Sequence, residues 1–411
     1  MAVNTADPPL MTDYPAIFRG YIVKNTQDIL ARVRPAGAIL PPAEREQALH
    51  TLSYALNLPE AWPDTRVLLL TMAPKMEQAG YRDEWIPYLV QGIQQSQALD
   101  DSEAEAELHF QLGRVYRLRS KYKEARIEFE TSIKGFERLN TPFNQARAMN
   151  RLAQVARLER RFAEATRLAE VALSLLGEQE AERGYSYLVL GMVAFDKRKW
   201  PEAVELLSLS LSLWARENNQ RMMGRCLMSL GAALLPMNRY EEAIDACQKA
   251  IILFEEIQDP IHQAITQMNL GNVYHYIDQS DKALELHLQA ERIFRQAQDL
   301  FYLAHINHNI GMAHRKLQQW ERAEEAYLLS IEQQEKIGNV AWLGNTMDGL
   351  GLVYLGQGQP EKAVATFEEA LNRLAEIEGE PGYENLFEMV SSHLREVSEK
   401  TAHEQTQVAN G

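Results

Sequence analysis

The stretch LGNVYHYIDQSDKALELHLQAERIF, residues 270–294, decides the fold of this 411-residue chain. Its apolar residues recur at intervals of three and four on both sides of a polar break at Asp278 to Asp281. This spacing predicts two amphipathic helices joined by a short turn. Gly271 on the first helix and Ala283 on the second are small enough for the two backbones to approach closely. The stretch therefore predicts a helical hairpin.

The same hairpin recurs along the chain. Equivalent segments begin at residues 112, 152, 190, 230, 270, 310 and 350, spaced by 40 residues except for one interval of 38. Each has a small residue at its second position, and an alanine follows that residue by twelve positions in every copy. One hairpin cannot bury its own apolar face, so stacked copies share a continuous core. The spacing predicts one elongated array rather than two or three globular domains.

This repeat resembles the tetratricopeptide repeat family, whose pattern has Leu-Gly and Tyr in the first helix and Ala, Phe and Ala in the second. The matching residues are Leu112, Gly113, Tyr116, Ala125 and Phe129 in the first clear copy, and Leu350, Gly351, Tyr354, Ala363, Phe367 and Ala370 in the last. The resemblance covers residues 103–378 and implies seven repeats in an all-α, right-handed superhelical solenoid of antiparallel helix pairs. The family's usual period is about 34 residues. The longer period here implies longer helices, as in some bacterial transcription regulators and signalling scaffolds.

The segments that flank the seven repeats are also expected to be helical, apart from the end of the chain. Residues 63–102 keep the spacing with degenerate residues, which predicts an eighth hairpin. Residues 1–62 are interpreted as a helical N-terminal extension or cap, and residues 379–400 as a C-terminal capping helix. Residues 401–411 are polar and without periodicity, which predicts a disordered tail.

Composition and charge exclude several classes of function. The chain has 42 basic and 57 acidic residues, a net charge of −15. This works against direct binding to nucleic acid or to an anionic membrane, because that affinity depends on Lys and Arg neutralising phosphates. We see no signal peptide, no stretch long enough to span a membrane, and only two cysteines, Cys226 and Cys247. We expect a cytoplasmic protein.

Motifs for catalysis or nucleotide binding are absent: the sequence has no GxxxxGK[ST], GxGxxG, GxSxG or HExxH. Both cysteines fall on helices of the repeat and are expected to be buried as small apolar residues. His305 and His308 share a helical face, and three readings stay open for them. They can form part of a groove wall, hold a metal together with His262 or His275, or respond to pH. We expect no cofactor, no metal and no enzyme activity.

The first helices of the repeats are expected to line a concave groove, the surface where such solenoids bind their partners. The helical stripe opposite the Leu-Gly face carries seven basic and three acidic residues, the reverse of the chain's overall sign. The predicted groove residues are Arg114, Arg117, Arg147, Asn150, Arg157, Tyr185, Met192, Phe195, Arg225, Met228, Met268, Asn272, His305, His308 and Arg315. In the last three repeats the stripe also holds Ile265, His275, Tyr276, Met312, Lys316, Asn345, Asp348, Leu352 and Leu355.

The middle of this stripe is apolar, with a methionine in each of four consecutive repeats. Flexible methionines suit adaptable contact with a helix or an extended segment, although the same side chains can belong to an ordinary core. The leading hypothesis is a non-catalytic adaptor or regulatory subunit that binds a peptide or protein segment with acidic and apolar anchors. The alternatives are a regulator that senses a small ligand or signal peptide, and the repeat partner of an effector protease or nuclease.

Overall fold

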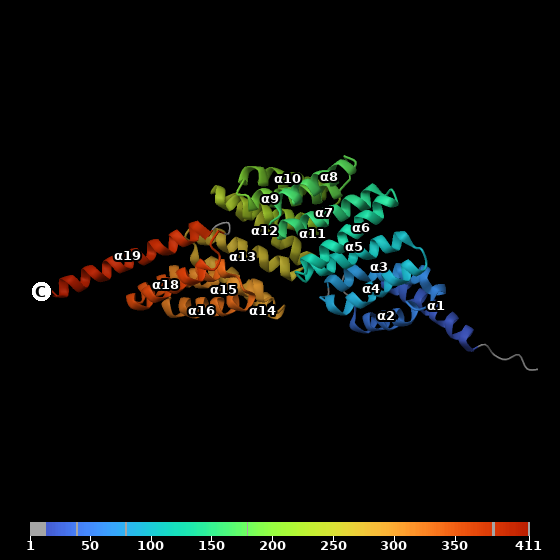
Figure 1. Ribbon diagram of the computed structural model, residues 1–411, viewed down its shortest axis with the longest axis horizontal. Coiled ribbons are helices and arrows are strands. Elements are labelled where there is room, and N and C mark those ends of the chain that lie inside the picture. The colour runs from blue at the N-terminus through green and yellow to red at the C-terminus, as the bar shows by residue number, and fades with distance from the viewer. Residues whose placement is uncertain (1–13, 38–39, 79, 179, 380–382, 410–411) are drawn as a thin grey trace, which may run out of the picture. The chain divides into compact units, whose positions relative to one another are not determined.

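The fold is built from helices joined by short turns. The computed structural model describes residues 14–37, 40–78, 80–178, 180–379 and 383–409. Within these ranges the secondary structure is helical, without a strand. Consecutive helices pack against each other as antiparallel pairs, for example α15 with α16 (Figure 1). The predicted all-α architecture of helical hairpins is confirmed. The chain divides into two units, residues 1–193 and residues 194–411.

The first unit contains α1 to α8 and most of α9. Its helices are α1 Tyr14–Val33, α2 Pro42–Ala55, the 3-10 helix η1 Pro59–Ala61, α3 Trp62–Gln78, α4 Arg82–Ala98, α5 Ser102–Leu118, α6 Tyr122–Arg138, α7 Pro142–Leu158, α8 Phe162–Leu175 and α9 Glu182–Asp196. Helices α1 and α2 pack beside α3, within the segment predicted as a helical extension. Helices α3 and α4 occupy the segment in which the degenerate hairpin is predicted, and their core surrounds Trp85.

The second unit contains α10 to α19. Its helices are α10 Trp200–Arg216, α11 Gln220–Leu234, the 3-10 helix η2 Leu235–Met237, α12 Tyr240–Glu256, α13 Pro260–Tyr276, α14 Ser280–Gln296, α15 Leu300–Lys316, α16 Trp320–Ile337, α17 Val340–Gly356, α18 Pro360–Ala375 and α19 Tyr383–Ala409. Helix α19 packs on α17 and α18. It continues to Ala409, so residues 401–409 are helical where a disordered tail is predicted, and residues 410–411 lie outside the described ranges.

A recurring turn sets the period of the repeat. The middle residue of the turn has a left-handed backbone at Asp278, Gln298 and Gln318, which are 20 residues apart. The next N–H donates to a carbonyl five residues earlier, as Asp299 N does to Phe294 O at 3.0 Å. This bond satisfies a carbonyl that the end of the helix leaves without a partner. A 17-residue helix and its turn span 20 residues, and two of them make one 40-residue hairpin.

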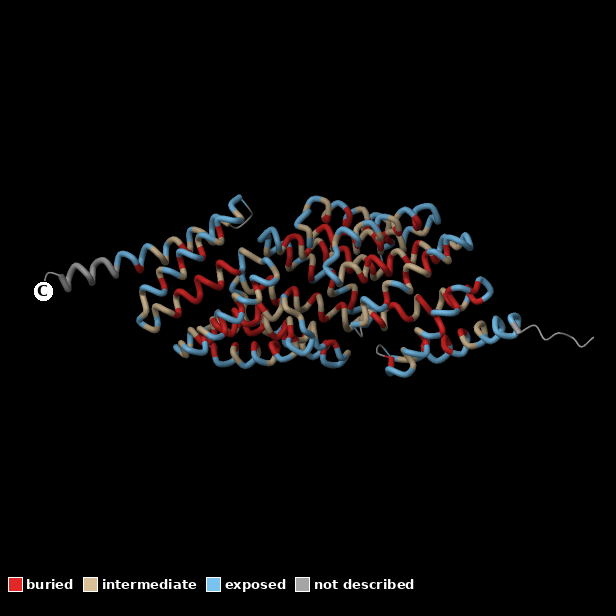
Figure 2. Tube along the Cα trace, turned by 60° about the horizontal axis from the view of Figure 1, so that its bottom comes forward, coloured by how far each residue is buried: buried red, intermediate tan, exposed pale blue. Residues whose placement is uncertain are grey.

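Small residues let the two helices of a hairpin approach closely. A Cβ atom at Gly271 would lie 2.4 Å from the His287 ring, and one at Gly351 would lie 2.4 Å from the Phe367 ring. Ala283 is fully buried, in keeping with the predicted close approach. The buried residues follow the helix faces that meet one another within each unit, and the exposed residues follow the outer faces (Figure 2). The hairpins thus expose one face of each first helix, where the candidate site lies.

Candidate functional site

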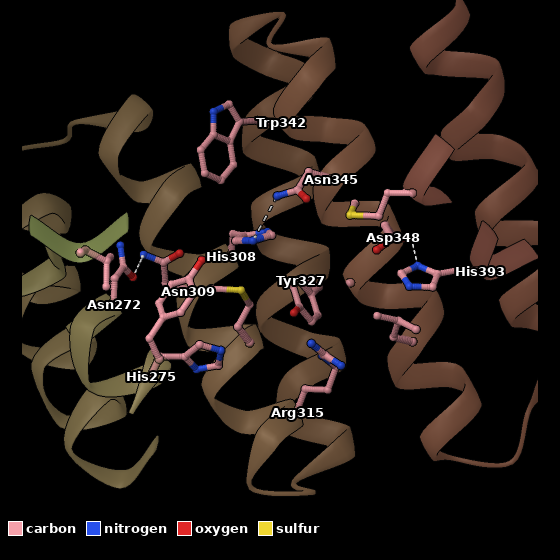
Figure 3. A pocket seen from close by; sticks show the side chains of 16 residues that line it. Asn272, His275, His308, Asn309, Arg315, Tyr327, Trp342, Asn345, Asp348 and His393 are labelled. Carbon is pink, nitrogen blue, oxygen red and sulfur yellow. Dashed lines mark hydrogen bonds and ion pairs between the residues drawn. The ribbon is translucent and has the colours of Figure 1, made fainter. Parts of the chain in front are cut away.

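A pocket of about 520 Å³ opens in the second unit, among the first helices of three successive repeats (Figure 3). Most of its wall comes from α13, α15 and α17, and one side chain each from α16 and η2 and two from α19 complete it. The lining residues are Leu235, Asn272, His275, Tyr276, His308, Asn309, Met312, Arg315, Tyr327, Trp342, Asn345, Asp348, Gly349, Leu352, Met389 and His393. A cavity of this size is typical of sites that hold a small ligand or a few residues of a peptide.

Three asparagines face the pocket, one from each first helix: Asn272 on α13, Asn309 on α15 and Asn345 on α17. Asn309 Nδ2 donates to Asn272 Oδ1 at 2.9 Å, and Asn345 Nδ2 donates to His308 Nε2 at 3.4 Å. A carboxamide offers two N–H donors and two acceptor lone pairs. The three side chains therefore keep hydrogen-bonding capacity for a bound molecule.

His308 is held as a neutral ring in the pocket wall. Its Nδ1 donates to Thr346 Oγ1 at 3.0 Å, because its Nε2 accepts from Asn345 and Thr346 Oγ1 itself donates to Trp342 O at 2.8 Å. This assignment of the tautomer follows from the network of partners. Burial lowers the pKa of His308 to about 3. The ring is uncharged near neutral pH and positions Asn345 and Thr346.

Asp348 is a buried carboxylate that is bonded to the C-terminal helix. It is 4% exposed, and its Oδ1 accepts from His393 Nδ1 at 2.7 Å. Burial raises the pKa of Asp348, while His393 and Arg315 act in the opposite direction. The bond joins α17 to α19 at the wall of the pocket and gives this carboxylate its own partner (Figure 3).

Arg315 is the arginine of this pocket, and it lies near Asp348 and Tyr327 without forming an ion pair. Among the described residues no carboxylate lies within ion-pair distance of it, whereas the neighbouring Lys316 is paired with Asp278. The Nε of Arg315 is buried without a hydrogen-bond partner. The guanidinium faces the Tyr327 hydroxyl without forming a well-aligned hydrogen bond, and it favours the phenolate. Burial is the larger effect and raises the pKa of Tyr327 to about 12, so the hydroxyl stays protonated.

Tyr327 occupies a position where other hairpins have an apolar side chain, such as Phe129 and Phe367. Cβ atoms at Gly311 and Gly349 would lie 2.9 Å and 2.7 Å from its ring, so the ring is wedged between α15 and α17. Its hydroxyl, fully buried, reaches the pocket from the second helix of the hairpin. Sequence reasoning assigned this position to the core and missed the residue. The available signal was a tyrosine at the position of a phenylalanine.

The predicted arginines of the first unit are engaged within that unit. Arg114 forms an ion pair with Glu77 at 2.5 Å, and Arg147 forms one with Glu107. The Arg147 guanidinium also lies over the Phe110 ring, 4.3 Å from its centroid. Each carboxylate comes from the preceding hairpin. Counting charges along the stripe therefore overstates the positive charge that is available to a partner.

Three further predicted arginines, Arg117, Arg157 and Arg225, also have interaction partners. None of them lines the described pocket. These arginines therefore give no evidence that the stripe is a basic surface available to a partner.

Two other predicted groove residues lie in the interior of the first unit. Asn150 is fully buried, where its Nδ2 donates to Glu182 Oε1 at 3.0 Å and its Oδ1 accepts from Ser186 Oγ at 2.8 Å. Tyr185 is 3% exposed and donates its hydroxyl hydrogen to Gln154. The position of Asn150 on the stripe was read as solvent-facing, but the neighbouring helix α9 covers it. We leave both residues out of the site proposed below.

The predicted apolar residues in the middle of the stripe are half-buried and do not line the pocket. Met268 packs on the core that α13 and α15 share. Phe195 lies against Trp200, with ring centroids 5.2 Å apart. The remaining two are Met192 and Met228. Met268 therefore packs on the core, which is the alternative that the sequence left open.

His305, the last predicted residue, stands between two aromatic rings. Its centroid lies 4.5 Å from that of Phe301 and 4.3 Å from that of Trp342. Burial lowers its pKa to about 4, so neither it nor His308 changes charge near neutral pH. No group of three potential metal ligands occurs in the described part of the chain. The pH-sensing and metal-binding readings of this pair therefore receive no support.

Of the predicted groove residues, the structure brings Asn272, His308 and Arg315 together in the pocket. The further stripe residues of the last three repeats that line the pocket are His275, Tyr276, Met312, Asn345, Asp348 and Leu352. Sequence reasoning missed Asn309, Tyr327, Trp342 and the two residues of α19, Met389 and His393.

Two properties of the remaining chain agree with its sequence. Cys226 and Cys247 are free and buried, as expected, and burial raises their pKa values to about 11 and about 12. Their thiolates are therefore scarce at neutral pH. Over the described ranges, no helix has both the length and the apolar character needed to cross a membrane.

The family comparison matches the repeats themselves. The model of the tetratricopeptide repeat matches residues 223–296 and 302–376, which cover α11 to α18 apart from short gaps. These residues form tetratricopeptide repeats. This confirms the resemblance seen in the Leu-Gly, Tyr, Ala and Phe pattern. No curated protein matches the sequence.

Solved structures with a similar fold extend the likeness over most of the length of the chain. A Rap protein complexed with competence and sporulation factor has 14% identity and a TM-score of 0.55, covering 82% of this chain and 98% of its own. Aspartyl phosphate phosphatase F from Bacillus subtilis has 16% identity and a TM-score of 0.54, covering 90% and 96%. A signal transduction ATPase with a tetratricopeptide repeat sensor from Pyrococcus horikoshii has 15% identity and a TM-score of 0.55, covering 88% and 50%. At these identities the likeness shows the fold alone.

Proposed function

We propose that this protein is a non-catalytic adaptor or regulatory subunit that binds a short segment of a partner protein. The binding site in this proposal is the pocket of the second unit. The observation that carries it is the combination of three partly used carboxamides with Arg315, which forms no ion pair with a described residue. Carboxamides pair with the N–H and C=O groups of an extended segment, and the guanidinium pairs with an acidic anchor.

The proposed binding surface lies in the last three repeats, whereas the sequence placed the main anchors in the first and middle repeats. Arg114 and Arg147 of the first unit form ion pairs with carboxylates of the preceding hairpin, whereas Arg315 in the pocket forms none with a described residue. The Rap protein was solved as a complex with competence and sporulation factor, which supports a binding role for this fold without naming a partner here. A cytoplasmic location is part of the proposal, supported by the free thiols of Cys226 and Cys247.

Affinity capture from the native cell tests the proposal if it is done with matched variants. Leu352→Trp fills the pocket, and Leu328→Trp adds the same bulk on an exposed face of α16. We expect a partner that is captured by the wild type and by Leu328→Trp and is lost with Leu352→Trp. Met312→Trp, a second way to fill the pocket, should give the same loss, and both pocket variants should keep the wild-type far-UV spectrum. A partner retained by both pocket variants would contradict the proposal.

A second candidate function is a regulator that senses a small ligand. The observation that favours it is the cavity of about 520 Å³, which can enclose a small molecule. A heat-stable extract freed of protein should then raise the melting temperature of the wild type. It should not raise that of Leu352→Trp. An unchanged wild-type melting temperature, together with partner capture, favours the adaptor.

A further inference from the structure

The pocket has an aromatic end, formed around Trp342 at the start of α17. The Trp342 ring lies against His305 and His308, with centroids 4.3 Å and 5.4 Å away, and the residue is 38% exposed. Phe301, which is 50% exposed, packs on the other side of His305. The histidines are neutral, so this end combines exposed aromatic surface with no net charge. It suits an apolar or aromatic side chain.

The opposite end is polar and holds Arg315 with Tyr327. The hydroxyl of Tyr327 is buried, protonated and without a well-aligned hydrogen-bond partner, and the Nε of Arg315 is also unpartnered. Asp348, the nearby carboxylate, is already bonded to His393. The planar guanidinium of Arg315, which is half-buried, matches the two oxygens of a carboxylate, while the fully buried Tyr327 hydroxyl lies beside the guanidinium and helps to position it. A phosphate dianion fits less well, because a single cation would face it beside Asp348.

The distance between the two ends follows from α15, which carries groups of both. Figure 3 shows Trp342 and Arg315 at opposite sides of the pocket, with His308 and Asn345 between them. From His305 or His308 to Arg315 the helix advances by seven to ten residues. At about 1.5 Å per residue this is about 10–15 Å. An extended peptide covers that length with about three to four residues, at about 3.3 Å each.

We infer that the pocket recognises a peptide segment in which a carboxylate, bound by Arg315, stands three to four residues from an apolar or aromatic side chain at Trp342. This inference rests on the proposed function, since it names the ligand class of the same pocket. The carboxamides of Asn272, Asn309 and Asn345 lie between the two anchors and face the intervening backbone. The carboxylate is either an acidic side chain or the C terminus of the partner.

The test uses a library of random octapeptides fused to the C terminus of a carrier protein, selected on the full chain. Such fusions offer both side-chain carboxylates and a free C-terminal carboxylate. Enriched peptides are then synthesised with the acidic side chain as an amide, or with the C terminus as an amide, to separate the two sources. Affinities are measured on wild type, Arg315→Gln, Arg315→Lys, Tyr327→Phe and the control Arg147→Gln.

We expect the amide that removes the recognised carboxylate to weaken binding to the wild type about tenfold to hundredfold, as for a charge-assisted hydrogen bond. The same amide should cause no further loss on Arg315→Gln. Arg315→Lys should recover only part of the affinity, Tyr327→Phe should show a smaller loss, and Arg147→Gln should bind as the wild type does. This pattern identifies the contact rather than a general loss of stability.

Two other results are distinguishable. Peptides that bind the wild type, lose binding with Leu352→Trp and show no dependence on a carboxylate or on Arg315 overturn this inference and leave the proposed function standing. A selection that enriches the same peptides on Leu352→Trp as on the wild type overturns the proposed function itself.

Discussion

Arg147 in the first unit and Arg315 in the second stand on the same stripe of the first helices, yet their surroundings differ. Arg147 is paired with Glu107 from the preceding hairpin and lies over Phe110. Arg315 lies in a pocket, faces a protonated phenol and forms no ion pair with a carboxylate in the described part of the chain. Both arginines have a buried Nε without a hydrogen-bond partner, so the ion pair is what differs. The first arrangement holds neighbouring hairpins together, and the second leaves binding capacity for another molecule.

The two units also differ in how they use histidine. The first unit has only His50, which is exposed, and His109, which is half-buried and bonded to Glu128. In the second unit, burial lowers the pKa values of His287 and His308 to about 3 and that of His305 to about 4. Buried neutral histidines are thus concentrated in the second unit, and His308 is one of those that line the pocket. Polar groups of this kind are common at binding sites and uncommon in cores that serve stability alone.

Lowering the pH should produce the largest difference in stability between the two units. A histidine that is neutral when folded and has an ordinary pKa of 6.5 when unfolded stabilises the fold above pH 6.5, and this stability is lost as the pH falls toward 3 to 4. At pH 5 the loss is about 2 kcal/mol for each of His287, His305 and His308. Hydrogen exchange, corrected for the intrinsic rate, should show α15 losing protection between pH 7 and pH 5 while α7 keeps it. An equal loss in both helices would contradict this difference.

Alanine at two glycines that each pack against an aromatic ring of a second helix tests whether packing at the pocket also serves binding. A Cβ at Gly113 would lie 2.9 Å from the Phe129 ring, and a Cβ at Gly349 would lie 2.8 Å from the Tyr327 hydroxyl. Each substitution should lower the free energy of unfolding by about 1–3 kcal/mol, because the ring must shift. Only Gly349→Ala should also weaken peptides selected on the pocket. Urea denaturation and titration calorimetry measure the two effects, and a matching binding loss in Gly113→Ala would argue against a localised site.

Neutral substitution of the two arginines should give opposite results for stability and binding. Arg147→Met leaves the half-buried Glu107 without its ion-pair partner, so we expect a loss of about 1–2 kcal/mol in unfolding free energy and unchanged ligand affinity. Arg315→Met removes no ion pair and should change stability by less than about 0.5 kcal/mol while abolishing the carboxylate preference. Urea denaturation of both variants checks the first effect. A larger stability loss in Arg315→Met would mean that its charge serves the fold.

The smallest expected change is a gain at His287. Both ring nitrogens are buried without partners, at a position where the first and last clear hairpins have Phe129 and Phe367. His287→Phe should raise the free energy of unfolding at pH 7 by up to about 1 kcal/mol. It should also remove about 2 kcal/mol of the acid sensitivity between pH 6.5 and pH 5, because one titrating group is gone. Thermal unfolding at the two pH values measures both, and an undiminished acid sensitivity would contradict the account of the buried histidines.

The sequence predicted the hairpins well because local rules determine them. Small residues such as Gly271, the alanine twelve positions later and the polar turns fix the helices and their close pairing without long-range information. The face of each first helix was predictable too, since Asn272, His308, Arg315 and Asn345 belong to the predicted stripe. Helical periodicity places all of them on one side.

What the sequence did not reveal depends on contacts between hairpins. The pairing of Arg147 with Glu107 joins residues 40 positions apart, and the burial of Asn150 depends on where α9 packs. His393 lines the pocket because α19 packs there, and α19 does not follow the repeat pattern from which the stripe was predicted. Tyr327 was assigned to the core because its ring occupies a core position of the repeat. Its hydroxyl nevertheless reaches the pocket.

The central claim is that binding occurs in the pocket of the second unit rather than along the arginine-rich stripe of the first. Hydrogen exchange of the full chain with and without a saturating selected octapeptide tests this most directly. The account predicts slowed exchange in α13, α15, α17 and the described part of α19, and unchanged exchange in α5 and α7. Protection centred on α5 and α7, with none around Arg315, would contradict it.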